Sequence, residues 1–177
     1  MQGEIFKKNV AGRIVEMETI VTLFPSNENS FKILFGGKVL EAMDELSGHL
    51  ATLFIGTKHL QAMHVNENVF FEKPIESGEI GKVQARVMFS TDKIIAVYIA
   101  VYGGSMQEPD DFSLRYEGFG FCAMFDTREA VRHVQRNLTP YENTDHPELV
   151  AAARFAFNAQ CALIKMLKAT HATNTGS

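Results

Sequence analysis

One acidic residue of the sequence differs in its surroundings from an ordinary surface carboxylate. From Gly36-Gly37 to Gly56 the chain has no helix breaker, and its apolar residues repeat every three or four positions, which predicts a helix. On this helix Asp44 lies between the polar and the apolar stripe, beside Gly48, which has no side chain to cover it. We therefore expect the carboxylate of Asp44 to be partly desolvated, as suits a general base.

The start of the predicted helix supplies a second chemical element. Gly36 and Gly37 permit close approach of the backbone, and the first N–H groups of a helix are unpaired and lie at its positive dipole end. Such donors polarise a carbonyl group, as in an oxyanion hole. Together with a carboxylate about two turns along, they form a plausible hydrolytic pair. The alternative is that Asp44 is an ordinary surface acid on the flank of a helix.

Other groupings of reactive residues are weaker. Glu45 and His49 are four positions apart, as metal ligands often are, but no third ligand is evident, so we expect no metal site. His64 and Glu67 lie in a predicted strand, where they form either a polar strand face or the wall of a site.

Five alternating or apolar segments around the helix predict strands. They are Arg13–Phe24, Met63–Phe71, Lys82–Phe89, Ile94–Tyr102 and Tyr116–Phe125. A further segment, Phe31–Phe35, is short and apolar and precedes the helix. Short turns between them favour one antiparallel sheet packed on the long helix, an α+β arrangement. Ile94–Tyr102 is apolar on both faces, so its outer face needs a cover, either the C-terminal helix or another protein surface.

The C-terminal part of the sequence is predicted to be helical. Thr127–Asn137 is short and charged, and Leu149–Leu167 follows a cap at Asp145–Glu148. From Ala169 the tail is polar and is expected to fray.

Composition excludes several classes of partner. The chain has 17 Lys and Arg against 21 Asp and Glu, a net charge of −4, and no basic run, which argues against nucleic acid. We find no signal peptide and no apolar run as long as a membrane span, so no membrane association is expected. Cys122 and Cys161 are far apart in apolar surroundings and are expected to be buried thiols in a reducing compartment, which predicts a cytoplasmic protein.

Two blocks of the sequence resemble those of hotdog-fold acyl-CoA thioester hydrolases, in the bacterial single-domain branch related to brain acyl-CoA hydrolase. The first block, Asn29–Asp44, contains an Asn, then Phe-Gly-Gly, then Met-Asp inside the long helix; the second is Val69–Gly78. The resemblance covers roughly Arg13–Phe125. It implies a hotdog fold, an antiparallel sheet wrapped around a long central helix, with residues 1–126 as the acyl-CoA thioesterase domain and residues 127–177 as a C-terminal helical extension and tail.

The resemblance also implies roles for individual residues. Asp44 is the catalytic carboxylate, as general base or nucleophile, and Asn29 positions water or substrate, facing Asp44 of a partner chain. The substrate-binding positions are Phe35, Gly36, Gly37, Phe71, Pro74 and Lys93. The implied substrate is acyl-CoA, with no cofactor, and the implied assembly is a homodimer, further built into a hexamer as a trimer of dimers. A shared site also fits the helix geometry, because Asp44 lies roughly 10 Å beyond Gly37.

The sequence departs from the family pattern at three places. Phe31 and Lys32 stand where a second Asn and a Gly are common, a Thr is missing at the start of the strand that carries Met63, and the hairpin that meets CoA reads Ser90-Thr91-Asp92-Lys93. These changes keep one alternative open, a hotdog protein that binds or senses acyl-CoA without turnover. A hotdog hydratase is a further alternative, but His49 lies on the wrong face of the helix for it and His64 has no obvious partner.

Overall fold

The structure of the chain, a computed structural model, describes residues 5–8, 12–21, 29–34, 36–57, 60–105, 107–108, 111–126, 138 and 140–174. Its elements are the strands and helices β1 (Ile5–Lys8), β2 (Ile14–Val21), α1 (Gly36–Ile55), β3 (Leu60–Phe71), β4 (Ile80–Ser90), β5 (Ile94–Gly104), β6 (Ser113–Asp126), β7 (Tyr141–Glu142) and α2 (Pro147–Asn174). Phe35 and the predicted helix Thr127–Asn137 lie outside the described residues.

The strands form one antiparallel sheet in the order β1-β2-β4-β5-β6-β3, and β7 pairs with the end of β4. The predicted single antiparallel sheet is therefore confirmed. β5 begins at its predicted start. β3, β4 and β6 begin two or three residues before theirs. Two strands were not predicted, β1 and β7, and both are short.

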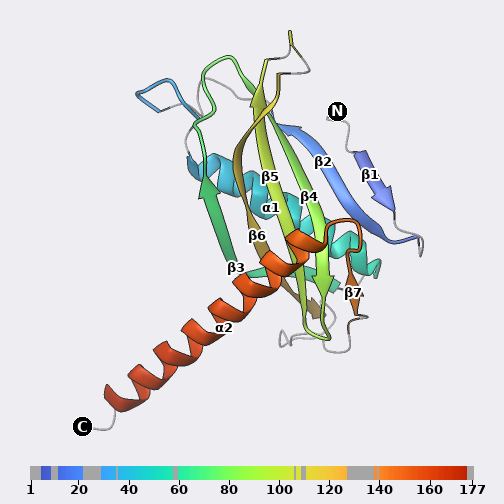
Figure 1. Ribbon diagram of the computed structural model, residues 1–177, viewed down its shortest axis with the longest axis vertical. Helices are drawn as coiled ribbons and strands as arrows, with labels where there is room; N and C mark the ends of the chain where they lie inside the picture. The colour runs from blue at the N-terminus through green and yellow to red at the C-terminus, as the bar shows by residue number, and fades with distance from the viewer. Residues whose placement is uncertain are drawn as a thin grey trace.

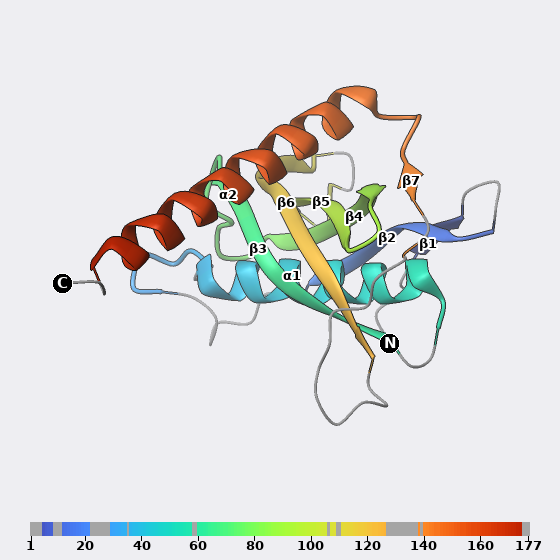
Figure 2. The same cartoon turned by 90° about the horizontal axis from the view of Figure 1, so that it is seen from below.

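Helix α1 packs across one face of this sheet (Figures 1 and 2). Met43 and Leu50 are fully buried against the strands, in a core that also holds Val83 and Val97. The predicted polar stripe is exposed, as expected for the side away from the sheet, at Lys38, Glu41, Glu45 and His49. The spacing of three and four residues also predicts Leu53 on the apolar face, but Leu53 is exposed, because it lies at the margin of that face near the end of the helix.

Helix α2 lies on the opposite face of the sheet (Figure 2). Val150 and Ala153 are buried against a second apolar cluster that includes Phe89 and Phe121. Along β5, alternate residues enter the two clusters, so Val97 faces α1 and Ala96 faces α2. The outer face of β5 was expected to be covered by the C-terminal helix or by another protein surface. In the structure, the first turns of α2 cover it.

Three predictions about the C-terminal part require correction or remain open. Helix α2 continues to Asn174, so the predicted frayed tail from Ala169 is helical as far as that residue. Cys122 is buried, but Cys161 in α2 is only partly buried. The boundary at residue 126 stays a prediction, although Leu138 beyond it lies in the same cluster as the buried face of α1.

The sequence has no contiguous apolar run as long as a membrane span, but one helix of the structure has that length and an apolar composition. Within the described residues, the part Pro147–Ala169 of α2 is long and apolar enough to cross a membrane, judged by length and composition only, and 11% of its most apolar stretch is buried. Counting contiguous apolar runs missed this segment because its alanines and large apolar residues are interrupted by single polar residues.

Candidate active site

The two sequence blocks that carry the resemblance lie side by side just before α1 begins. Leu34 N–H donates to the carbonyl of Ile75 (2.9 Å), and Ser77 N–H donates to the carbonyl of Lys32 (3.0 Å). Ile33 and Glu76 form an isolated antiparallel bridge between the same segments. The loop after β3 therefore fixes the position at which the chain enters α1.

Asn29 shapes the loop that leads to this bridge. Its side-chain Oδ1 accepts the N–H of Phe31 (2.9 Å) and, at the longer distance of 3.5 Å, that of Ile33. Lys32, within this turn, has a φ of 61°, in the left-handed region that favours glycine. In the single chain, then, the side-chain oxygen of Asn29 holds its own loop, and these bonds do not involve its amide nitrogen.

The N-terminus of α1 lies beside an exposed aromatic ring. A Cβ built on Gly36 would lie 3.5 Å from Cε1 of Phe71, so the Phe71 ring approaches the first turn of the helix. Phe71 in turn meets Tyr116 edge to face, with 4.9 Å between the ring centroids, and burial raises the pKa of Tyr116. The start of α1 is thus a set of helix N–H donors next to an apolar wall.

Asp44 does not occupy the environment predicted for it. Asp44 is exposed in the single chain. Asp44 is eight residues from Gly36, which corresponds to roughly 12 Å along the helix. A Cβ built on neighbouring Gly48 would meet nothing within 4 Å, so the space beside Asp44 is open, as expected.

Lys93 lies at the other end of the sheet from Gly36. Phe71 of β3 pairs with Tyr116 of β6, which also pairs with Val101 of β5. Ile94, next to Lys93, is at the other end of β5, where it pairs with Ala123. Seven residues of β5 separate these two positions, about 23 Å of strand. Within one chain, Lys93 and the N-terminus of α1 are not parts of the same site.

Pro74 is exposed in the loop between β3 and β4, which is held from the side of β6. The N–H groups of Glu72 and Lys73 donate to the carbonyl of Arg115 (2.8 and 3.2 Å). The Arg115 guanidinium also pairs with Glu79 in a largely buried ion pair. The sequence interpretation missed this pair, since nothing in the spacing of two residues so far apart indicates that they meet.

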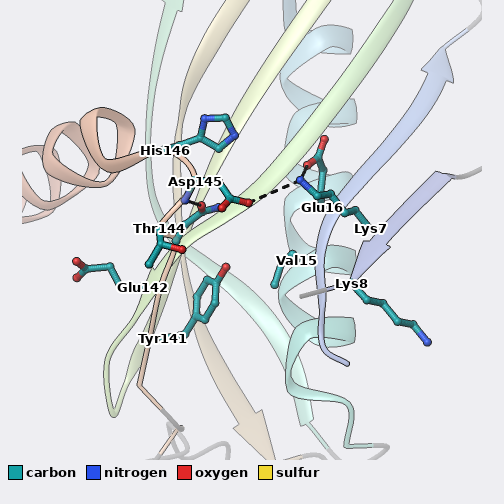
Figure 3. Close-up of a pocket in the computed structure, with 10 residues that line it drawn as sticks. Lys7, Lys8, Val15, Glu16, Tyr141, Glu142, Thr144, Asp145 and His146 are labelled. Carbon is teal, nitrogen blue, oxygen red and sulfur yellow. Dashed lines mark hydrogen bonds and ion pairs between the residues drawn. The ribbon is translucent and has the colours of Figure 1, made fainter. Parts of the chain in front are cut away.

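A separate hollow of about 420 Å³ lies at the N-terminus of α2 (Figure 3). Lys7 of β1 lies between two carboxylates there: its Nζ is 3.8 Å from Oε2 of Glu16 and 3.8 Å from Oδ2 of Asp145. Burial raises the pKa of Tyr141 in its wall. The sequence interpretation missed this hollow because its two sides, β1 and β7, were not predicted. In the part of the chain that the structure describes, no three His, Cys, Asp or Glu side chains are grouped as a metal site.

No protein-family model and no curated protein matches the sequence of this chain. Its structure, however, is similar to solved structures of enzymes. An acyl-CoA hydrolase from Staphylococcus aureus, in complex with butyryl coenzyme A, coenzyme A and coenzyme A disulfide, superposes with a TM-score of 0.71 at 18% identity, covering 89% of this chain and 94% of the hydrolase. Further structures of that hydrolase contain variants in which an aspartate, a threonine or an asparagine is replaced by alanine.

Two other structures give the same result. An acyl-CoA hydrolase from Bacillus cereus has a TM-score of 0.69 at 16% identity over 92% of this chain and 94% of the hydrolase. A hexameric acyl-CoA thioesterase in the apo state has a TM-score of 0.68 at 17% identity over 84% of this chain and 94% of the thioesterase. The order of the strands, the central helix α1 and these superpositions agree: the chain has the hotdog fold of the acyl-CoA hydrolases that it resembles.

Proposed function

We propose that the chain hydrolyses acyl-CoA thioesters to free CoA and a carboxylic acid. The observation that carries this proposal is the N-terminus of α1, where Gly36 lies against Phe71 and two distant segments fix the entry of the helix. The fold shared with acyl-CoA hydrolases supports the substrate class.

The proposed reaction uses the two chemical elements of α1 and no metal or organic cofactor. The N–H groups at Gly36 and Gly37 polarise the thioester carbonyl and stabilise the oxyanion that forms on it. Asp44 either takes a proton from water as the water attacks the carbonyl carbon, or attacks that carbon itself to give an anhydride that water then opens. In both routes the C–S bond breaks and the CoA thiolate acquires a proton.

A two-fold dimer would assemble these parts, which are separated in one chain. In the described part of the chain β3 pairs with β6 alone and forms one edge of the sheet. Antiparallel pairing of two β3 strands would place the Leu60 end of one beside the Phe71 end of the other. The hairpin with Lys93 lies at the Leu60 end of its sheet, so it would approach the partner's α1 entry, within reach of the CoA phosphates.

The same dimer would bring a second α1 to the same face of the sheet, where it can cover the open flank at Asp44. We therefore propose that each site takes Asn29 from one chain and Asp44 from the other. A trimer of such dimers is the proposed full assembly, since one of the similar structures is a hexameric thioesterase.

Mixing Asn29→Ala and Asp44→Asn chains, unfolded and refolded together, is expected to restore activity that neither variant has alone. A hybrid dimer keeps one intact site, and random pairing makes half of the dimers hybrids, so about a quarter of wild-type activity should return. The measurement is thiol release from acyl-CoA, with each variant refolded alone as the control. Isolated hybrids with no more activity than the parents would show that the site is not shared.

A panel of acyl-CoAs of increasing chain length tests the reaction itself. Thiol release by the wild-type chain on at least one member is the expected result. Tight binding of acyl-CoA without turnover at any length would replace the hydrolase with the alternative, a protein that binds or senses acyl-CoA.

A further inference from the structure

Helix α2 is longer than the sheet that it covers. Its first turns are buried on the outer sheet face through Val150 and Ala153. Farther along, Gln160 Nε2 donates to Oδ1 of Asn68 (2.8 Å), a contact with the edge strand β3. Figures 1 and 2 show the remaining turns projecting past β3, and we call this part, Cys161–Asn174, the arm.

The face of α2 that meets the sheet continues into the arm. Starting from Val150, steps of three and four residues lead through Ala153, Phe157 and Gln160 to Ile164 and Leu167. Ile164 and Leu167 are 45% and 52% exposed, because the sheet of their own chain has ended. The arm thus presents aliphatic side chains in the direction in which a continued sheet would lie.

An apolar groove runs along the same edge. It has a volume of about 390 Å³ and is bordered by Phe70 of β3 and by Phe155 and Leu163 of α2. Phe70 is 62% exposed and Phe155 is 77% exposed. The backbone edge of β3 and the exposed apolar surface of α2 therefore lie next to each other. Both are surfaces that a second protein chain could cover.

We propose that the arm is a clasp that packs on the outer sheet face of a second copy of this chain. The inference rests on the β3-edge dimer of the proposed function. In a dimer with its two-fold axis perpendicular to the sheet, the outer faces of both copies lie on the same side of the joined sheet. The outer face of the partner's β3 and β6 would therefore lie against Ile164 and Leu167. By symmetry, the arm of each chain packs on the sheet of the other chain. The same contact covers the apolar groove beside β3 in both chains.

The clasp has a consequence for activity. If each site needs two chains, the arm stabilises the site without touching the substrate. Loss of the arm contact should lower the specific activity at low enzyme concentration and leave it unchanged at concentrations at which the dimer is saturated.

The test compares two double variants that each add two glutamates to the arm. Ile164→Glu with Leu167→Glu alters the face that continues the sheet contact. Ala162→Glu with Ala169→Glu alters exposed positions about 200° round the helix from them and is the matched control. Sedimentation is expected to show a dimer dissociation constant weakened roughly 100-fold in the first variant and changed by less than about 3-fold in the control.

A second experiment detects the contact without the glutamate substitutions, which could also affect folding. It places a photo-crosslinker at position 164 in dimers of isotopically labelled and unlabelled chains. Cross-links from one chain to residues 60–71 or 113–126 of the other are expected. Cross-links within one chain only, or equal dissociation constants for the two variants, would overturn the clasp.

The outcomes separate this inference from the proposed function. A wild-type chain that stays monomeric yet hydrolyses acyl-CoA would overturn the shared site and the clasp together. A stable dimer that needs Ile164 and Leu167 but has no turnover would overturn the hydrolase and keep the clasp. Binding of the wild type to vesicles of phosphatidylglycerol and phosphatidylcholine, lost in the first variant while the dimer is unchanged, would assign the arm to a lipid surface instead.

Discussion

An Asp44→Asn variant is expected to lose thioester hydrolysis by roughly 1000-fold or more while keeping its fold. The amide of asparagine has nearly the shape of the carboxylate, but it neither accepts a proton from water nor attacks a carbonyl carbon. Because Asp44 is exposed in the single chain, the substitution leaves no cavity and no buried unpaired group there. The measurements are kcat/KM from thiol release and the melting temperature.

Glu45→Gln is the matched control for that variant. Glu45 is the next residue of α1, is also exposed, and belongs to the polar stripe that faces away from the sheet. The control makes the same chemical change one position along and should keep kcat/KM within about 3-fold of the wild type. Wild-type turnover by Asp44→Asn would remove this carboxylate from the mechanism, whereas equal losses in both variants would indicate an effect of charge alone.

Gly118→Ala is expected to destabilise the folded chain by about 3 kcal/mol or more. Gly118 of β6 pairs with Val69 of β3 and with Ile99 of β5. A Cβ at this position would lie 2.2 Å from the carbonyl oxygen of Asn68 and 3.0 Å from Cα of Val69. These are backbone atoms of a paired strand, so they cannot rotate away, and β3 would have to separate from β6. Urea denaturation of the two proteins measures the difference.

Gly48→Ala provides the comparison for that prediction. Gly48 is in α1, and a Cβ there would meet nothing within 4 Å. Alanine in a helix interior is more stable than glycine by roughly 0.5–1 kcal/mol, so this chain should unfold at a slightly higher urea concentration. If both alanine variants unfolded at the wild-type concentration, the close approach of β3 to Gly118 would be wrong.

The elements that the sequence predicted well are those whose pattern is set by burial on a single sheet. The helix from Gly36 and the alternation from Lys82 to Phe89 reflect contacts with the core of the chain itself, and both appear in the structure. β1 and β7 have four and two residues, too few for a periodic pattern; β1 pairs with β2, and β7 pairs with the end of β4 beyond its pairing with β2.

The candidate site was predicted in its parts but not in their arrangement. The Gly36-Gly37 entry and the loop with Pro74 were identified from motifs, and the structure brings these two segments together. The distance between Gly36 and Lys93 depends on how strands are ordered across the sheet, and the exposure of Asp44 depends on which elements cover α1. Neither property is local in the chain, so no spacing of residues indicates it.

The left-handed backbone at Lys32 makes position 32 selective for residue type. Glycine adopts a φ of 61° freely, and asparagine or aspartate does so at small cost, but for valine or isoleucine it is a genuine outlier. The carbonyl of Lys32 accepts the N–H of Ser77, so a residue that straightened the turn would disconnect the two segments in front of α1. In a saturation mutagenesis experiment, position 32 should therefore accept glycine, asparagine and aspartate and reject valine and isoleucine, a pattern that follows from the torsion angle of the backbone.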